Sequence, residues 1–119
     1  MTALGRHLLA EFTGCDAQAL SDLGRVTAAM LQAAEASGAT IVTHSFHHFS
    51  PHGVSGAVII AESHLAIHTW PEHGFAAVDF FSCGPVDMDR GLAVLKAAFA
   101  ATGETRLALE RGPLQVLRP

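Results

Sequence analysis

The sequence predicts an α+β fold, a two-layer α/β sandwich in which one antiparallel sheet carries two helices on one face. The first observation behind this prediction is the order of patterns: a strand, a helix, a run of strands joined by turns, a second helix and a last strand. The second is size and composition. With 119 residues, 50% hydrophobic and 15% charged, the chain can build one core but not two. We therefore expect residues 1–119 to form a single domain.

The N-terminal part predicts one strand and one helix. Leu4–Phe12 alternates loosely between apolar and polar residues, and Gly14 and Asp16 then supply a turn and a helix N-cap. From Leu20 onward, apolar positions recur at steps of three and four residues, until Gly38 favours the end of the helix. The residues of this predicted stripe are Leu23, Thr27, Met30, Leu31 and Ala34.

The rest of the chain predicts a run of strands, a second helix and a last strand. Four segments rich in β-branched and aromatic residues are separated by turn residues, which indicates consecutive hairpins and an antiparallel sheet. These segments are Ala39–Phe49, Val54–Ala61, His64–Trp70 and Phe75–Cys83. Asp87 can cap a helix whose apolar stripe is Leu92, Leu95 and Phe99. Thr105–Glu110 then predicts the last strand, and Gly112–Pro119 a loose tail.

One face of such a sheet has no helices to cover it. The apolar run Val58–Ile60 suits burial on both sides of the sheet, so a second subunit is expected to cover the open face. We therefore expect at least a homodimer that forms through the sheet.

Charge and cysteine content exclude several classes of protein. A net charge of -4 and a pI near 6.0 leave no basic surface for a nucleic acid or an anionic membrane. No apolar run reaches the ~20 residues that span a bilayer, and the N-terminus lacks a signal-peptide pattern, so we expect a cytoplasmic protein. Cys15 and Cys83 are too few for a disulfide framework and are expected to be free thiols.

Reactive side chains are concentrated in two segments, Glu62–Glu72 and Phe80–Gly84. Serine, histidine, carboxylate and cysteine groups are unusual in segments otherwise built like buried strands, because unpaired polar groups are costly to bury. Taken alone, each has an ordinary structural interpretation. Ser63 fits a strand-end hydroxyl, His68 a hydrogen-bonded core histidine, and Cys83 a small buried hydrophobic residue.

Two other kinds of site fit these residues poorly. A histidine-rich stretch could hold zinc, but it has no Cys-x-x-Cys pair and no Glu between histidines at helical spacing, so we predict no metal site. Its histidines are His44, His47, His48, His52, His64, His68 and His73. A serine hydrolase is also disfavoured, since Ser63 lacks the Gly-x-Ser-x-Gly turn.

The string Glu-Ser-His-Leu-x-Ile-His-Thr-Trp-Pro-Glu over residues 62–72 resembles the prokaryotic S-adenosylmethionine decarboxylase proenzymes. The resemblance extends over roughly the first three-quarters of the chain with unchanged spacing. Its other matching strings are Leu4–Leu8, Gly38–Val42, Gly53–Gly56 and Cys83-Gly84.

The resemblance implies that the chain cuts itself between Glu62 and Ser63. The Ser63 hydroxyl attacks the Glu62 carbonyl to form an ester, and elimination and hydrolysis then leave a pyruvoyl cofactor at position 63. By the same resemblance, His68 removes the Ser63 α-proton, and Ser55 assists this processing through a hydrogen bond. The products are a β chain, residues 1–62, and an α chain, residues 63–119.

The resemblance also implies the reaction and its substrate. S-adenosylmethionine forms a Schiff base with the pyruvoyl group, loses CO2 and is released as S-adenosyl 3-(methylthio)propylamine for spermidine biosynthesis. Cys83 reprotonates the substrate carbon, Phe49 and Trp70 stack on adenine, and Glu72 holds the ribose. The expected assembly is a heterotetramer of two α and two β chains.

Strand geometry adds one argument about this site. Ser63 and His68 are five residues apart, so in one regular strand their side chains point to opposite faces. Either a bulge or turn lies between them, or Ser63 and Cys83 of one subunit meet His68 and Ser55 of the other. We favour the shared site, since a second subunit also covers the open face.

Three alternatives remain open at this point. The substrate could be arginine or ornithine, if the residues that face adenine have changed. The chain could be a histidine-rich metal-binding module without catalysis, or an inactive paralogue that is never cut.

Overall fold

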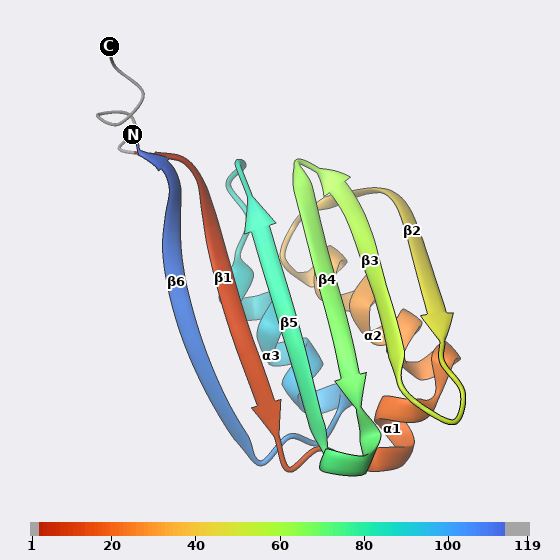
Figure 1. Cartoon of the computed structure of the whole chain (residues 1–119). Helices are drawn as coiled ribbons and strands as arrows, with labels where there is room; N and C mark the ends of the chain where they lie inside the picture. The colour runs from red at the N-terminus through yellow and green to blue at the C-terminus, as the bar shows by residue number, and fades with distance from the viewer. Residues whose placement is uncertain (1–2, 114–119) are drawn as a thin grey trace.

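A computed structural model of the chain describes residues 3–113, which form one six-stranded antiparallel sheet (Figure 1). The strand order is β2-β3-β4-β5-β1-β6. In chain order the strands are β1 (Ala3–Thr13), β2 (Thr40–His48), β3 (Val54–Ala61), β4 (Ser63–Trp70), β5 (Phe75–Ser82) and β6 (Gly103–Pro113). The first half of the chain thus supplies β1 to β3 and the second half β4 to β6, and β1 lies between β5 and β6.

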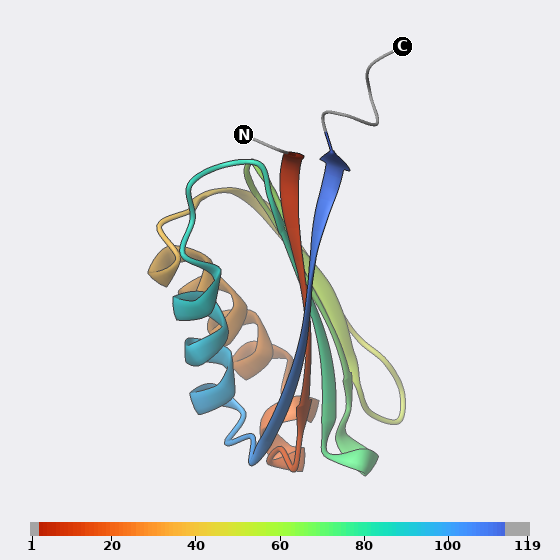
Figure 2. The same cartoon turned by 90° about the vertical axis from the view of Figure 1, so that its left-hand side faces the viewer.

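The helices lie on one face of the sheet, and the other face is open (Figure 2). They are α1 (Ala17–Ser21), α2 (Leu23–Ala36) and α3 (Met88–Ala98), with a 3-10 turn, η1 (Pro71–His73), between β4 and β5. The predicted α+β sandwich with a single antiparallel sheet is therefore confirmed. None of the helices within residues 3–113 is both long enough and apolar enough to cross a membrane.

The core lies between the helices and the sheet. Strand β5 shows why, because its residues alternate along its whole length between buried and partly buried side chains. Its inward positions, together with apolar residues of β1, β4 and all three helices, fill the space between the two layers. The largest fully buried side chains are Phe12, Phe80, Phe99, Leu20, Met30, Leu65, Ile67, Leu92 and Leu95.

The first helical segment differs from the single continuous helix predicted. Asp22 ends α1 and caps α2, because its carboxylate accepts a hydrogen bond from the Arg25 backbone N–H. The buried stripe of α2 is also rotated from the predicted one, and Leu23 is 40% exposed. Its members are Val26, Ala29, Met30, Ala33 and Ala34. The prediction was wrong here because the spacing of apolar residues does not show whether a carboxylate such as Asp22 caps a new helix or lies on the surface of a continuous one.

The strands agree with the prediction to within a few residues, except at the C-terminus. Strand β6 is longer than the predicted Thr105–Glu110, because it pairs with β1 as far as Ala3 and Pro113. Gly112 therefore belongs to a strand and not to a loose tail. The remainder of the predicted tail, residues 114–119, lies outside the described residues.

The open face carries exposed apolar side chains. Val58 and Ile60 are buried under the helices, but Ile59 between them is 43% exposed. Leu107 and Leu109 of β6 are 57% and 43% exposed. The run that was expected to be buried on both sides therefore has one residue uncovered in a single chain, on a face with further apolar groups.

Candidate active site

The segment predicted to carry the chemistry lies at one end of the sheet. Glu62 alone connects β3 to β4, so Ser63 is the first residue of β4. Ser63 is registered with Ser82, the last residue of β5, and Cys83 follows directly. Figure 1 shows the β3–β4 turn and the end of β5 side by side at the same end of the sheet. The antiparallel ladder therefore brings together residues twenty positions apart.

Ser63 and Cys83 form the first pair of reactive groups. The Ser63 Oγ lies 3.6 Å from the Cys83 Sγ, and either atom can donate the hydrogen bond. Ser63 is half-buried and Cys83 exposed. A cavity of about 420 Å³ opens beside the thiol, with Gly5, Arg6 and Pro85 in its wall. The thiol thus lies at the border of a space that can hold a small molecule, with the Ser63 hydroxyl in contact with it.

The carbonyl between Glu62 and Ser63 is held by two donors. The Cys83 backbone N–H donates to the Glu62 oxygen at 3.1 Å, and the Ser82 hydroxyl donates to the same oxygen at 3.0 Å. The Ser82 Oγ in turn accepts from the Gly84 N–H at 3.0 Å. Ser82 is 1% exposed. Nothing in the sequence pattern selected Ser82, since its strand position indicates only that the side chain faces inward.

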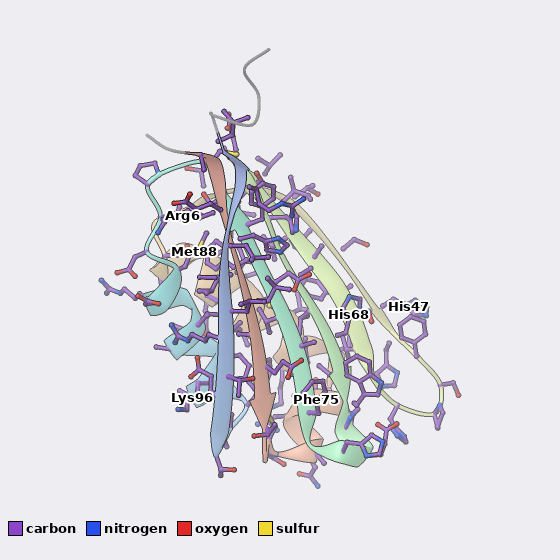
Figure 3. All side chains as sticks on the ribbon, turned by 60° about the vertical axis from the view of Figure 1, so that its left-hand side comes forward. Arg6, His47, His68, Phe75, Met88 and Lys96 are labelled. Carbon is purple, nitrogen blue, oxygen red and sulfur yellow. The ribbon has the colours of Figure 1, made fainter. Side chains whose placement is uncertain are left out.

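Ser55 and His68 form the second pair. They are directly opposite each other in the β3–β4 ladder, and the Ser55 Oγ lies 2.9 Å from the His68 Nδ1. His68 projects from the open face, on the side away from the helical layer that contains Met88 and Lys96 (Figure 3). A hydroxyl in hydrogen-bond contact with one ring nitrogen fixes the orientation of the imidazole, and it can accept from a protonated Nδ1 or donate to an unprotonated one.

The two pairs do not meet within one chain. The β3–β4 register runs without a shift from Ser63 to His68, so no bulge or turn lies between them. At about 3.3 Å per residue, five positions separate the two residues by roughly 16 Å along β4. Ser63 shares the parity of buried Leu65 and Ile67, whereas His68 is on the exposed parity. Of the two explanations weighed for the sequence, the local bulge is wrong.

The residues predicted to contact substrate lie at the opposite end of β4 from Ser63. Trp70 is 40% exposed and packs against Phe75 with ring centroids 5.4 Å apart, and its ring lies 6.5 Å from that of His68. Phe49 is 49% exposed. The Glu72 carboxylate accepts from the His52 Nε2 at 3.2 Å, if the imidazole is protonated there. Trp70 therefore accompanies the Ser55–His68 pair and not the Ser63–Cys83 pair.

The other histidines and the second thiol are not part of either pair. Within residues 3–113, no three His, Cys, Asp or Glu side chains lie close enough together to hold a metal ion. Cys15 and Cys83 are both free, as predicted. Burial raises the pKa of the Cys15 thiol, and its backbone N–H donates to the Gly74 oxygen, beside the turn after β4. Cys83 is thus the thiol at the Glu62–Ser63 turn.

Comparison with known proteins gives the same family by three routes. The model of the family described as S-adenosylmethionine decarboxylase matches residues 6–112. The S-adenosylmethionine decarboxylase proenzyme of Acidithiobacillus ferrooxidans is 52% identical over 118 residues, which cover 98% of this chain and 89% of the relative. The proenzyme of Thermotoga petrophila is 52% identical over 113 residues, covering 94% and 87%.

A solved structure agrees with these sequence relatives. The crystal structure of the adenosylmethionine decarboxylase from Aquifex aeolicus is similar to this chain with a TM-score of 0.86. The two are 32% identical in sequence, and the match covers 94% of this chain and 93% of the other. The similarity therefore extends over the whole sheet and its helices.

Proposed function

The chain belongs to the S-adenosylmethionine decarboxylase family, and from this premise we propose that it is a proenzyme that cuts itself at Glu62–Ser63. The mature enzyme then converts S-adenosylmethionine to S-adenosyl 3-(methylthio)propylamine and CO2. The observation that carries the proposal is the contact of the Ser63 hydroxyl with the Cys83 thiol, directly after the Glu62 carbonyl.

The residues around Ser63 fit a pyruvoyl cofactor formed from this serine. The Glu62 carbonyl, which precedes Ser63, accepts two hydrogen bonds, and these polarise it for attack by the Ser63 hydroxyl. The Cys83 thiol, 3.6 Å from that hydroxyl, is a proton donor at the same place. A pyruvoyl group supplies a carbonyl that binds an amine covalently and withdraws the electrons left when CO2 departs.

Self-cleavage uses the residues in a fixed order. The Ser63 Oγ attacks the Glu62 carbonyl carbon, and its proton passes to the Ser63 nitrogen as the peptide bond becomes an ester. His68 then removes the Ser63 α-proton, and the Glu62 carboxylate leaves from the Ser63 β-carbon. Ser55 holds the imidazole at Nδ1; in the tautomer whose Nδ1–H donates to the Ser55 Oγ, Nε2 carries no proton and is the base.

In the mature enzyme, Cys83 is the acid. After loss of CO2 the substrate α-carbon would need a proton from the protein before the product could leave. The Cys83 thiol is exposed beside the cavity and in contact with position 63, so it can deliver that proton. Phe49, Trp70 and Glu72 bind the adenine and the ribose.

We further propose a dimer in which the open faces of two sheets pack together. One chain cannot bring His68 to Ser63 across roughly 16 Å of β4. A second chain packed in the opposite direction would bring its own His68 to the end of β4 where the backbone of Ser63 lies. The exposed side chains of Ile59, Leu107 and Leu109 provide apolar surface for this contact. Each site then combines Ser63 and Cys83 of one subunit with Ser55 and His68 of the other, and each dimer has two sites.

The two fragments of each subunit are expected to stay together after cleavage. Strand β4 of the second fragment pairs with β3 of the first, and β1 of the first pairs with both β5 and β6 of the second. Because these ladders run through the middle of the sheet, the fragments cannot separate without unfolding it. The assembly is thus a heterotetramer of two β chains, 1–62, and two α chains, 63–119.

The experiment that tests the proposal is the intact mass of the purified protein under denaturing conditions, followed by an assay of CO2 release. We expect two chains that break at Glu62/Ser63, the second beginning with a ketone in place of an amine. S-adenosylmethionine should release CO2, and arginine and ornithine should not. Ser63→Ala should remain a single chain, because it has no hydroxyl to attack Glu62, whereas Ser21→Ala in α1 should be cut normally.

Two results would contradict the proposal. A wild-type chain that stays at its full mass after long incubation would leave no route to the cofactor. Cleavage of Ser63→Ala at the same bond would show that another group attacks the carbonyl.

A further inference from the structure

We propose that the Ser82 hydroxyl is a catalytic group in self-cleavage. Together with the Cys83 backbone N–H, it forms a two-donor site that stabilises the negative charge on the Glu62 carbonyl oxygen while Ser63 attacks. The inference rests on the proposed function, because it concerns the same bond, and it adds a residue and a step to it.

The geometry at the Glu62 oxygen is that of an oxyanion site. Its two donors lie at 3.0 Å, from the Ser82 hydroxyl, and at 3.1 Å, from the Cys83 N–H. A carbonyl oxygen has two lone pairs, and both donors are already within hydrogen-bond distance of it before the attack. The carbonyl that accepts these two hydrogen bonds belongs to the peptide bond that is cut in the proposed reaction.

The hydroxyl proton of Ser82 is directed to Glu62 by its neighbours. The Gly84 N–H donates to the Ser82 Oγ at 3.0 Å, which occupies one lone pair of that oxygen. The Ser82 proton then has two acceptors in reach, the Glu62 oxygen at 3.0 Å and the Gly84 oxygen at 3.4 Å. The shorter bond goes to Glu62. The hydrogen bond that the Ser82 Oγ accepts from Gly84 also polarises the hydroxyl, which strengthens the bond that it donates to Glu62.

Burial increases the effect of this donor. Ser82 is 1% exposed, so water does not compete for its proton. In a site of low dielectric constant, a hydrogen bond to a developing charge is stronger than in water and needs no reorganisation of solvent. The Cys83 N–H is fixed as part of the backbone after β5. Both donors are therefore in place before Ser63 attacks.

The site acts at one defined step. When the Ser63 Oγ bonds to the Glu62 carbon, the electron pair of the C=O bond moves to the Glu62 oxygen, where the two donors meet it. The C–N bond then breaks, the electron pair returns to restore the carbonyl, and the hydroxyl proton of Ser63 ends on the nitrogen. The product is an ester and a free amine. Ser82 thus acts before His68, whose proton removal consumes the ester.

The test compares two variants that differ by one hydroxyl group. Ser82→Thr keeps the donor and Ser82→Val has the same shape without it, so any strain from the added volume affects both equally. Each is expressed as the full chain, and the fraction cut at Glu62/Ser63 is followed by intact mass over time. We expect Ser82→Val to be cut on the order of a hundredfold more slowly than Ser82→Thr, as for the loss of one oxyanion donor.

A second readout separates catalysis from folding. In a His68→Ala background the ester accumulates, and hydroxylamine releases two chains from it. Adding Ser82→Val should lower the rate at which hydroxylamine-sensitive chains appear, while the melting temperature stays close to that of Ser82→Thr. Ser37→Ala is the matched control, because Ser37 is 3% exposed and its hydroxyl donates to the backbone oxygen of Ala34 in α2.

The outcomes distinguish this inference from the proposed function. If the wild type is cut and Ser82→Val is cut as fast as Ser82→Thr, the role of Ser82 is wrong and the proposed function stands. If the wild type is never cut, both are overturned. A slow Ser82→Val with an equally slow Ser37→Ala would mean that the loss of any buried hydroxyl slows processing, and would overturn the role of Ser82.

Discussion

The four side chains proposed for the chemistry occur in the structure as two pairs, Ser63 with Cys83 and Ser55 with His68. The string Glu-Ser-His-Leu-x-Ile-His-Thr-Trp-Pro-Glu was enough to select Ser63 and His68, and a resemblance in spacing selected Ser55 and Cys83. The shared site proposed from the sequence already grouped Ser63 with Cys83 and Ser55 with His68, and each group is in contact within one chain. Ser82 was missed, because its contact with the Glu62 oxygen crosses a strand ladder.

Cys83→Ala tests the proposed acid at the scale of a single residue. This variant should cut itself, because the Cys83 N–H remains, but should turn over roughly a hundredfold or more slowly, as expected for loss of a general acid. The measurement is the rate of CO2 release per cut subunit. Cys15→Ala removes the other thiol and should behave as the wild type. Normal turnover of Cys83→Ala would mean that a different group supplies the proton.

His68→Ala tests the proposed base. Without an imidazole at this position the Ser63 α-proton stays, so the chain should stop at the ester. Hydroxylamine under denaturing conditions should then release two chains, seen by intact mass, whereas untreated protein keeps its full mass. His73→Ala in η1 is the control and should be processed normally. A full-length His68→Ala chain that resists hydroxylamine would place His68 before the ester and not after it.

At the scale of elements, β4 is the strand that links the layers. The Thr69 hydroxyl accepts from the Val54 N–H of β3 and donates to the Leu20 oxygen of α1, both at 2.8 Å. Thr69 is 7% exposed. One side chain thus connects β3, β4 and the helical layer beneath them. Because Thr69 precedes Trp70, its two hydrogen bonds hold the end of β4 that carries the proposed adenine contact against β3 and α1.

Thr69→Val should destabilise the fold. The substitution keeps the shape but leaves a buried N–H and a buried carbonyl without partners, at a cost of about 1–3 kcal/mol for each group. Urea unfolding is the measurement, in a Ser63→Ala background so that every chain is intact. Thr43→Val, on exposed β2, should change the free energy of unfolding by less than about 0.5 kcal/mol. Equal effects of the two changes would show that the bonds of Thr69 contribute nothing.

The elements themselves were predictable to different degrees. The hairpins follow from β-branched segments separated by turn residues, and Asp16 and Asp87 cap the helices expected of them. The break at Asp22 was not predictable, because the apolar pattern passes through it unchanged. The end of β6 was also missed, since its length is set by pairing with β1 and not by its own residues.

At the scale of the whole molecule, the open face and the separation of the two pairs lead to the same assembly. A single chain leaves Ile59, Leu107 and Leu109 exposed and the base far from its proton. The alternation of side chains along β4 predicted this separation from sequence alone, because the period of a strand fixes which residues share a face. The second subunit that we propose to complete the site was predicted from sequence only as a hypothesis.

Subunit sharing can be tested by mixing two variants that are each inactive alone. In a dimer of His68→Ala with Ser63→Ala, one site combines the Ser63 of the first chain with the His68 of the second. Co-expression should therefore restore cutting in every His68→Ala chain that pairs with the other variant, which is about half of the His68→Ala chains in a random equal mixture, as measured by intact mass with distinguishable tags. If the site lies within one chain, the mixture stays uncut apart from the hydroxylamine-sensitive ester.

Because β1 lies between β5 and β6, it matters whether the chain folds before or after it is cut. Before the cut, folding joins parts of one chain and its rate does not depend on concentration. After the cut, three of the five ladders join two separate polypeptides. Refolding from denaturant is then a second-order reaction, which dilution slows and which aggregation of the loose fragments can overtake. The proposed cut at Glu62–Ser63 would thus also make the unfolding of the enzyme hard to reverse.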